Sequence, residues 1–171
     1  MNWTIRQLDG DDVVAYRALR HEALTNHPEA YASSPEGLAQ RSDDDLRQML
    51  GEMAFFGVFD KELAGMAAVG RSEGERERHR GWLYQLYVAP RLRGSGAAAA
   101  LIERVAAHAG TEMLQLHLSV ATHNQPAIRL YQKAGFVIYG TDPRFLHVNG
   151  RYVDEHLMVR FFDEAPGKSE P

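Results

Sequence analysis

The amino-acid sequence predicts an α/β domain of the α+β type, in which a mixed sheet of about seven strands is flanked by about four helices. Strand and helix patterns alternate in the second half of the chain, and this alternation favours parallel pairing. The earlier strands follow one another across short turns, as in hairpins. The 171 residues suffice for one domain with one sizeable core, which we place at residues 1–162.

The N-terminal segment begins with an alternating strand pattern at 3–8, WTIRQL. The acidic run DGDD then offers N-cap carboxylates to a helix over about 12–25. The apolar side of this helix consists of Val13, Tyr16, Leu19 and Ala23. Two prolines and several small polar residues predict a loop at 26–37.

The next segment predicts a helix followed by a hairpin. Ser42 and Asp45 form a capping-box pattern, and apolar residues follow at helical spacing up to Met53. FFGVFD at 55–60 and ELAGMAAVG at 62–70 then predict two strands joined by a tight Asp-Lys turn.

The middle of the chain predicts a strand, a helix and another strand. WLYQLYVAP at 82–90 is strongly apolar, and it follows a segment at 71–81 whose mixed charges indicate an exposed hairpin tip. RLRGSGAAAALIERV leads into a helix that begins at about Gly96 and continues to Ala109. EMLQLHLSV at 112–120 predicts the next strand.

The C-terminal part predicts a helix and the last strands. NQPAIRLYQKAG at 124–135 has proline in its first turn and glycine at its end, as helices do. FVIYG predicts a short strand, and 145–162 predicts a β-hairpin with Asn149-Gly150 as a type I′ turn. We expect residues 163–171 to form a disordered tail.

Composition limits the classes of function. A net charge of −4 without a basic stripe argues against nucleic-acid and membrane-surface binding, and no segment has the apolar length of a membrane span. The chain has no cysteine, and its eight histidines show no metal-ligand spacing, so we expect no metal site. The N-terminus lacks the features of a signal peptide, and we expect a cytoplasmic protein.

The start of the helix after RLRGSG predicts an anion site. The first backbone N–H groups of a helix have no intrahelical partner and lie at the positive end of its dipole. Small residues at 94–98 leave these groups accessible, and Arg91 and Arg93 add positive charge, which suits a pyrophosphate. The segment is neither a P-loop nor a dinucleotide fingerprint. The alternative is a helix start that merely packs tightly.

Two motifs resemble those of the GNAT superfamily, the GCN5-related N-acetyltransferases. RGSGAA at 93–98 fits the family signature Arg/Gln-x-x-Gly-x-Gly/Ala at the start of the helix after the fourth strand. NQPAIRLYQKAGF at 124–136 fits a second family pattern, N-x-x-A-x-x-L-Y-x-x-x-G-F. The resemblance covers nearly the whole chain and is most specific at 82–136.

The resemblance implies acetyl-CoA as the acetyl donor, bound by the backbone. Its pyrophosphate would be held by the amides of Arg93, Gly94, Ser95, Gly96, Ala97 and Ala98. Its pantetheine arm would pair with Leu86, Tyr87 and Val88 like an added strand, while the strand at 112–120 diverges. Asn124 would bind the pantetheine, cap the last helix, or do both.

The resemblance also implies Tyr131 as the general acid that protonates the leaving thiolate. The alternative for Tyr131 is simple packing in the core. The general base is not apparent, although His117 titrates near neutrality and is one candidate beside a purely structural role. Ser119 lies with His117 on one side of the strand at 112–120, Gln85 lies on the strand at 82–90, and both belong to the expected substrate pocket.

The acceptor is expected to be the primary amine of a small molecule. Ser119 replaces the Glu that ribosomal-protein acetyltransferases of the superfamily carry at this place, which disfavours their activity. Tyr31, Tyr84 and Arg144 are candidate pocket contacts, but exposed packing accounts for them equally well. A protein or peptide acetyltransferase and a non-catalytic acyl-CoA-binding domain remain alternatives. A homodimer through the aromatic C-terminal strand remains open, because a buried strand would have the same pattern.

Overall fold

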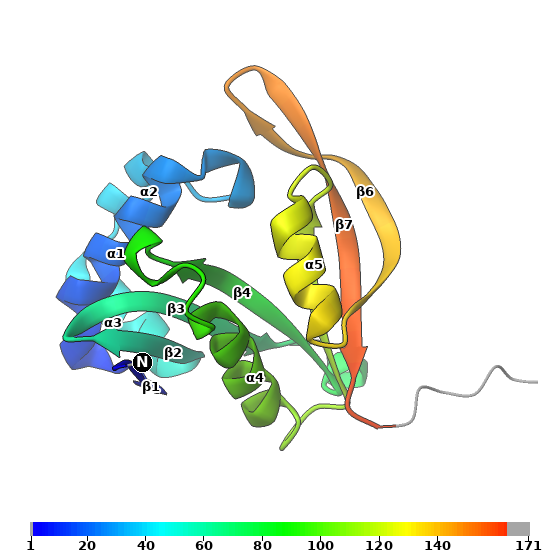
Figure 1. Ribbon diagram of the computed structural model, residues 1–171, viewed down its shortest axis with the longest axis horizontal. Helices are drawn as coiled ribbons and strands as arrows, with labels where there is room; N and C mark the ends of the chain where they lie inside the picture. Colours follow the sequence, from blue (N-terminus) through cyan, green and yellow to red (C-terminus); the bar gives the residue numbers. More distant parts are fainter. Residues whose placement is uncertain (1, 164–171) are drawn as a thin grey trace, which may run out of the picture.

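A seven-stranded mixed sheet forms the centre of the computed structural model, which describes residues 2–163 (Figure 1). Its strand order is β1-β2-β3-β4-β5-β7-β6, and only the β4–β5 pair is parallel. The strands are β1 Thr4–Gln7, β2 Ala54–Asp60, β3 Glu62–Arg71, β4 Arg80–Val88, β5 Gln115–Ala121, β6 Val137–Val148 and β7 Arg151–Phe161. The predicted α+β architecture with a mixed sheet is therefore confirmed.

Helices cover both faces of the sheet, and two adjacent residues of β2 show how. Phe55 packs edge-on against Tyr16 of α1, whereas Phe56 packs against His108 of α4 on the opposite face. The helices are α1 Val13–Asn26, α2 Pro35–Ala39, α3 Asp43–Glu52, α4 Ala97–Ala109 and α5 Gln125–Lys133. In the part of the chain that the structure describes, none is long and apolar enough to cross a membrane.

Local sequence signals set several of these boundaries. The side chain of Ser42 accepts a hydrogen bond from the backbone of Asp45, and the Asp45 carboxylate accepts one from Ser42, which is the predicted capping box of α3. Asn149 and Gly150 have φ values of +49° and +76°, as a type I′ turn requires. The β6–β7 hairpin is thus confirmed at its predicted turn.

The C-terminal strands differ from the expectation in two ways. FVIYG and the first arm of the hairpin form one strand, β6, which is bent by irregularities between Ile138 and Gly140 and between Asp142 and Leu146. β7 lies between β5 and β6, so the aromatic segment at 151–161 is an interior strand and β6 is the edge of the sheet. Residues 164–171 of the expected tail lie outside the described residues.

The N-terminal connection also contains more structure than the loop predicted at 26–37. A short 3-10 helix at Pro28–Ala30 and the helix α2 at Pro35–Ala39 occupy it. Ser34 caps α2 by accepting a hydrogen bond from the backbone of Gly37, and Pro35 is the first helical residue. The 3-10 helix at Pro28–Ala30 contacts β5 and β6, whereas α2 packs against α1, so the connection reaches from the N-terminal to the C-terminal half of the molecule.

The two parallel strands separate soon after they meet. β4 and β5 are paired only at Arg80–Gln115, Gly81–Leu116 and Trp82–His117. A β-bulge in β4 causes the separation, because Tyr84 and Tyr87 are three residues apart but face Ala68 and Met66, which are two apart. The divergence expected for the strand at 112–120 is present, and it leaves one edge of β4 without a strand partner.

Candidate active site

The start of α4 is open at the backbone. Gly96 is the N-cap of α4 with φ +85° and has no side chain to cap the helix, while the Ser95 hydroxyl oxygen accepts a long hydrogen bond of 3.4 Å from the backbone N–H of Ala97. Gly94 has φ +74°, and a Cβ atom at either glycine would meet nothing within 4 Å. The left-handed conformation favours glycine, and the missing side chains leave the first N–H groups of α4 accessible to an anion. The structure therefore provides the free helix start that the sequence predicted.

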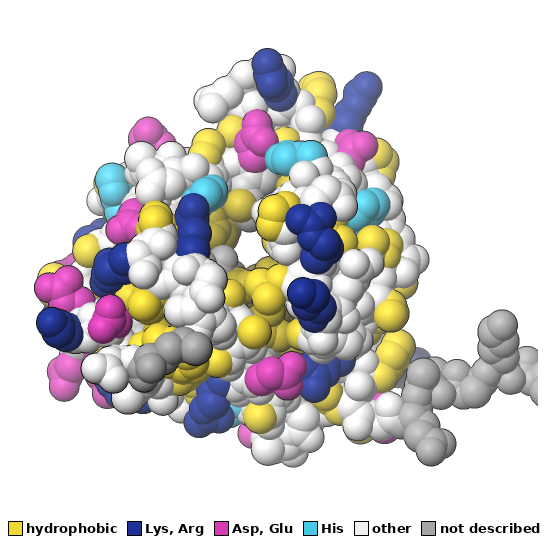
Figure 2. Space-filling model, in the orientation of Figure 1, with side chains coloured by type: hydrophobic (Ala, Val, Ile, Leu, Met, Phe, Trp, Pro, Cys, Tyr) yellow, Lys and Arg dark blue, Asp and Glu magenta, His cyan; other side chains and the backbone are white. Residues whose placement is uncertain are grey.

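Positive charge lies beside this helix start. A guanidinium N–H of Arg93 lies 2.9 Å from Nε2 of His27, and burial together with the Arg93 charge lowers the pKa of His27. Arg91 instead donates to the carbonyl of Leu63 at 3.3 Å, so its side chain is held against β3. Figure 2 shows the surface hollowed between the two halves of the molecule, with Lys and Arg side chains on both sides. An anionic ligand would meet a cationic rim there.

The unpaired edge of β4 forms one side of the gap between β4 and β5. The Tyr31 hydroxyl donates to the Leu86 carbonyl at 2.9 Å, a position that a paired strand would otherwise occupy. Tyr87 points away from the gap, since its hydroxyl donates to Glu22 of α1 at 2.7 Å. The residues expected to pair with pantetheine, Leu86, Tyr87 and Val88, therefore offer backbone rather than side chains.

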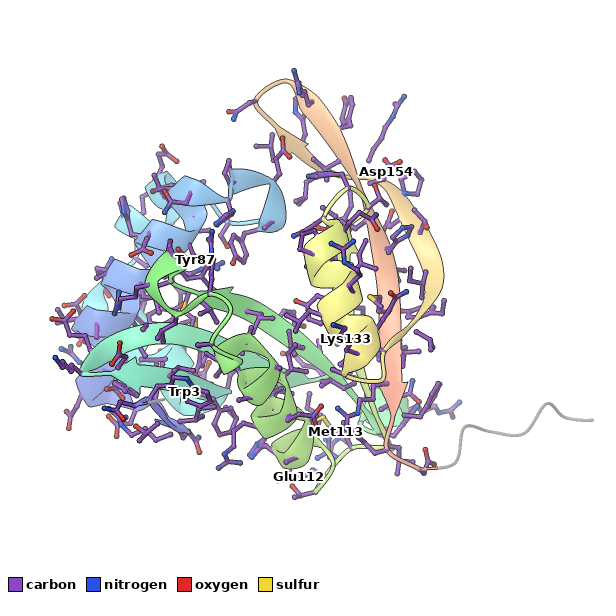
Figure 3. The ribbon with its side chains drawn as sticks, in the orientation of Figure 1. Trp3, Tyr87, Glu112, Met113, Lys133 and Asp154 are labelled. Atoms are coloured by element: carbon purple, nitrogen blue, oxygen red, sulfur yellow. The ribbon has the colours of Figure 1, made fainter. Side chains whose placement is uncertain are left out.

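Helix α5 forms the other side of the gap (Figure 3, where Tyr87 and Lys133 mark the two sides). Asn124 caps α5, because its Oδ1 accepts a hydrogen bond from the backbone N–H of Ala127 at 3.3 Å. Its amide nitrogen has no such role in the cap, so capping leaves a donor for a ligand. A cavity of about 430 Å³ lies beside Asn124 and extends to Asn26 and Glu29.

Tyr131 is buried on α5, with 7% of its surface exposed. Burial is the main cause that raises the pKa of its phenol, and the neighbouring Tyr31 and Glu155 raise it further. Its ring packs edge-on against Phe136 at a centroid distance of 5.9 Å. The raised pKa keeps the phenol protonated, and within residues 2–163 its hydroxyl makes no hydrogen bond that would occupy this proton.

His117 is engaged at both ring nitrogens. Nε2 lies 2.8 Å from the amide nitrogen of Gln115 and accepts from Arg80 Nε at 3.3 Å, while Nδ1 lies 3.1 Å from the Tyr139 hydroxyl. The ring also packs against Trp82 and Tyr139. Burial, the Arg80 charge and His79 lower the pKa of His117 to about 4. A histidine without a free lone pair is a poor general base, and this geometry favours the structural alternative.

The substitution His117→Gln is expected to flatten the acid side of the stability profile. The pKa of His117 is about 6.5 in the unfolded chain and about 4 in the folded protein. Between pH 4 and pH 6.5, therefore, the unfolded chain binds a proton at His117 and the folded protein does not. The contribution is therefore present above pH 6.5 and is lost as the pH falls toward 4, about 3 kcal/mol in total. Urea unfolding across this range measures it. The exposed His21→Gln is the control, and parallel pH profiles for H117Q and the native protein would contradict the assignment.

The remaining pocket candidates divide into two groups. The side-chain oxygen of Gln85 accepts from the Tyr16 hydroxyl at 2.8 Å, which holds Gln85 at φ +56° in the bulge of β4. Ser119 hydrogen-bonds Glu155 on the neighbouring strand β7. Tyr31 also lies at the gap, because its hydroxyl donates a hydrogen bond to the Leu86 carbonyl of β4. These contacts bring Tyr31, Gln85 and Ser119 to the two sides of the gap.

Two candidates are held elsewhere by their own contacts. Tyr84 is 43% exposed. Its ring lies over Gly70 of β3, next to Met53 at the end of α3. Arg144 lies in a bulge of β6 with φ +55°, and its guanidinium stacks 5.0 Å from the centre of the exposed Tyr152 ring. Neither contact brings its side chain to the gap. The alternative interpretation of the sequence, packing at the exposed surface, therefore describes both Tyr84 and Arg144.

Sequence reasoning missed Arg20 and Glu155, two buried charged residues. Arg20 on α1 is 5% exposed and Glu155 on β7 is 3% exposed. Burial lowers the pKa of Arg20 and is the main cause that raises the pKa of Glu155, with Asp142 adding to the latter and the Ser119 hydrogen bond opposing it. A signal was present: Arg20 lies one turn after Tyr16 on the apolar side of its helix, and Glu155 interrupts an apolar strand.

A mixed sheet that opens between its two parallel strands, beside a free helix start, is the architecture of an acyl-CoA-dependent acetyltransferase class. The chain belongs to the acetyltransferase (GNAT) family, whose sequence model matches residues 16–136. The family resemblance inferred from the two motifs is thereby confirmed.

The chain is also similar to individual proteins of known activity or known structure. The chain is 39% identical over 95 residues to a spermidine N(1)-acetyltransferase of Vibrio cholerae, an alignment that covers 54% of each chain. The chain thus spans about half the length of that relative. It is 26% identical over 150 residues to the L-amino acid N-acetyltransferase AaaT of Escherichia coli, covering 85% of this chain and 91% of the relative. A solved phosphinothricin acetyltransferase from Sinorhizobium meliloti, in complex with AcCoA, has the same fold with a TM-score of 0.81 at 19% identity, covering 94% of this chain and 89% of that one.

Proposed function

We propose that the protein is an acetyl-CoA-dependent N-acetyltransferase that acetylates the primary amine of a small molecule by direct attack in a ternary complex. One observation carries the proposal: the gap between β4 and β5 opens onto the free start of α4, and the buried phenol of Tyr131 stands on the opposite side. Family membership and the relatives that act on spermidine and amino acids support it.

The backbone of the chain would hold the donor. The N–H groups from Arg93 to Ala98 bind the pyrophosphate, because helix dipole and missing side chains both favour an anion there. The free edge of β4 pairs with the amides of the pantetheine arm, as an added strand would. A backbone N–H near Leu86–Val88 stabilises the oxyanion that forms when the amine attacks the thioester.

Tyr131 would protonate the sulfur as the carbon–sulfur bond breaks. The attack converts the thioester carbonyl into a tetrahedral intermediate, whose collapse expels a thiolate. A phenol whose pKa is raised by burial stays neutral at physiological pH and so retains a proton for this leaving group.

Calorimetric titration with acetyl-CoA and with free CoA tests the donor site first. We expect both to bind, because the pyrophosphate and pantetheine contacts do not involve the acetyl group. A screen of primary amines for CoA release then tests the reaction. Binding without release for any amine or peptide would indicate the non-catalytic acyl-CoA-binding alternative, whereas release only with peptides would indicate a peptide acetyltransferase. If neither form of CoA binds, the proposal is refuted.

A further inference from the structure

Two buried charges of opposite sign, on the two sides of the gap, have no oppositely charged partner within residues 2–163. Within residues 2–163, only three buried side-chain polar atoms have no hydrogen-bond partner, and two of them are Nη1 of Arg20 and Oε2 of Glu155. Neither residue forms a salt bridge in that part of the chain. An unpaired buried charge is costly, and a fold retains one where a ligand completes it. Each group therefore needs a ligand charge opposite to its own.

Arg20 lies next to the reacting end of the gap. Its guanidinium carbon is 4.5 Å from the centre of the Tyr31 ring, and the Tyr31 hydroxyl bonds to the Leu86 carbonyl at the free edge of β4. Tyr16, one helical turn before Arg20, donates to Gln85 in the bulge of the same strand. Arg20 is thus enclosed by the two tyrosines that shape the β4 side of the site, and its fork of donors matches a carboxylate.

Glu155 lies on the β5–β7 side of the same sheet face. In the β5–β7 pairing it faces Ala121, two residues along β5 from Ser119, which hydrogen-bonds its carboxyl group. Ser119 and His117 point to the face of Trp82 and Tyr84, which is also the face of α1. The carboxyl group of Glu155 is also near enough to Tyr131 to raise the pKa of that phenol.

We infer that the acceptor is an amino acid in its zwitterionic form, with its carboxylate on Arg20 and its ammonium on Glu155. This inference rests on the proposed function and names the substrate class of the same site. Glu155 takes one proton from the ammonium, and the freed nitrogen attacks the thioester carbon. The carbon–sulfur bond then breaks, Tyr131 gives its proton to sulfur, and the second proton leaving nitrogen restores Tyr131. An amino acid thus supplies both missing charges and the nucleophile.

The first test compares matched acceptors with the native protein. Each L-amino acid is assayed for CoA release beside the amine that lacks its carboxylate and beside its α-amide, at equal concentrations of acetyl-CoA. We expect at least one amino acid to exceed both counterparts by about 100-fold in kcat/KM, the loss typical of truncating one partner of a buried charge pair. If amines are acetylated without any carboxylate preference, the inference is overturned while the proposed function stands. If CoA fails to bind, the proposed function fails.

The second test separates the two ends of the acceptor. Arg20→Met is expected to raise KM for the amino acid by about 100-fold and to leave KM for the matched amine unchanged, with partial recovery in Arg20→Lys. Glu155→Gln is expected to lower kcat by about 100- to 1,000-fold, and Glu155→Asp less so. The surface variants Arg47→Met and Glu103→Gln, whose side chains form exposed ion pairs, are the matched controls.

Thermal unfolding distinguishes this role from a structural one. Because neither buried charge has an oppositely charged partner in the described part of the chain, neutral replacements remove a desolvation cost, and we expect the melting temperatures of R20M and E155Q to equal or exceed that of the native protein. A lower melting temperature together with equal losses for amino acid and amine would show that the charges serve the fold alone, and would overturn the inference.

Discussion

Replacing Tyr131 with phenylalanine is expected to lower kcat by about 100- to 1,000-fold, the usual contribution of a general acid. The substitution removes one oxygen and keeps the ring that packs on Phe136. Within residues 2–163 the hydroxyl makes no hydrogen bond, so its loss leaves no partner unsatisfied and the fold is expected to persist. Steady-state kinetics of CoA release with the best acceptor measures the effect.

We expect Y131F to change kcat without changing the affinity for CoA. The affinity of Y131F for CoA, measured by calorimetry, is expected to change by less than about twofold, because a group acting only on the departing sulfur contributes to the transition state. Tyr152→Phe, on an exposed tyrosine of the hairpin, is the control. Native kcat in Y131F would show that the phenol only packs, as the alternative interpretation of the sequence holds.

Replacing Gly96 with valine is expected to weaken CoA binding by about 100-fold or more, since each hydrogen bond to a charged group is worth about 1.5–3 kcal/mol. Gly96 has φ +85°, where a β-branched residue is strained, and its side chain would stand in the open space before the N–H groups of α4. Calorimetric titration with CoA measures the loss.

Gly150→Val provides a matched control for backbone strain. Gly150 has φ +76° and the same open surroundings, but it lies in the hairpin turn away from α4. Both variants are expected to lose similar stability, and only G96V is expected to lose CoA affinity. Equal CoA affinities in the two variants would mean that the helix start does not bind the pyrophosphate.

Local patterns were sufficient for most elements of the fold. The capping box at Ser42, the Asn149-Gly150 turn and the proline-to-glycine limits of α5 each depend on contacts within a few residues, and each lies where the sequence placed it. The bent strand β6 was divided in two, because bulges around Arg144 interrupt the alternation on which strand prediction depends.

The chemistry of the site was predictable only where a contiguous motif carries it. The free helix start follows from RGSGAA, since the N–H groups and the glycines that expose them are neighbours in the chain. The environment of His117 was not predictable, because its partners come from β4, β5 and β6. Tyr84 and Arg144 were placed near the substrate by their position in the sequence, yet packing holds them elsewhere.

The sequence by itself determined the family, the strand and helix order, and the two motifs that line the donor side of the gap. The tertiary structure alone decided that Arg20 and Glu155, 135 positions apart, are both buried on one face of the sheet and form no salt bridge within residues 2–163. The physical reason is that helix and turn signals are local in the chain. The cost of an unpaired charge, by contrast, depends on every element packed around it, and these elements meet only after the sheet has formed.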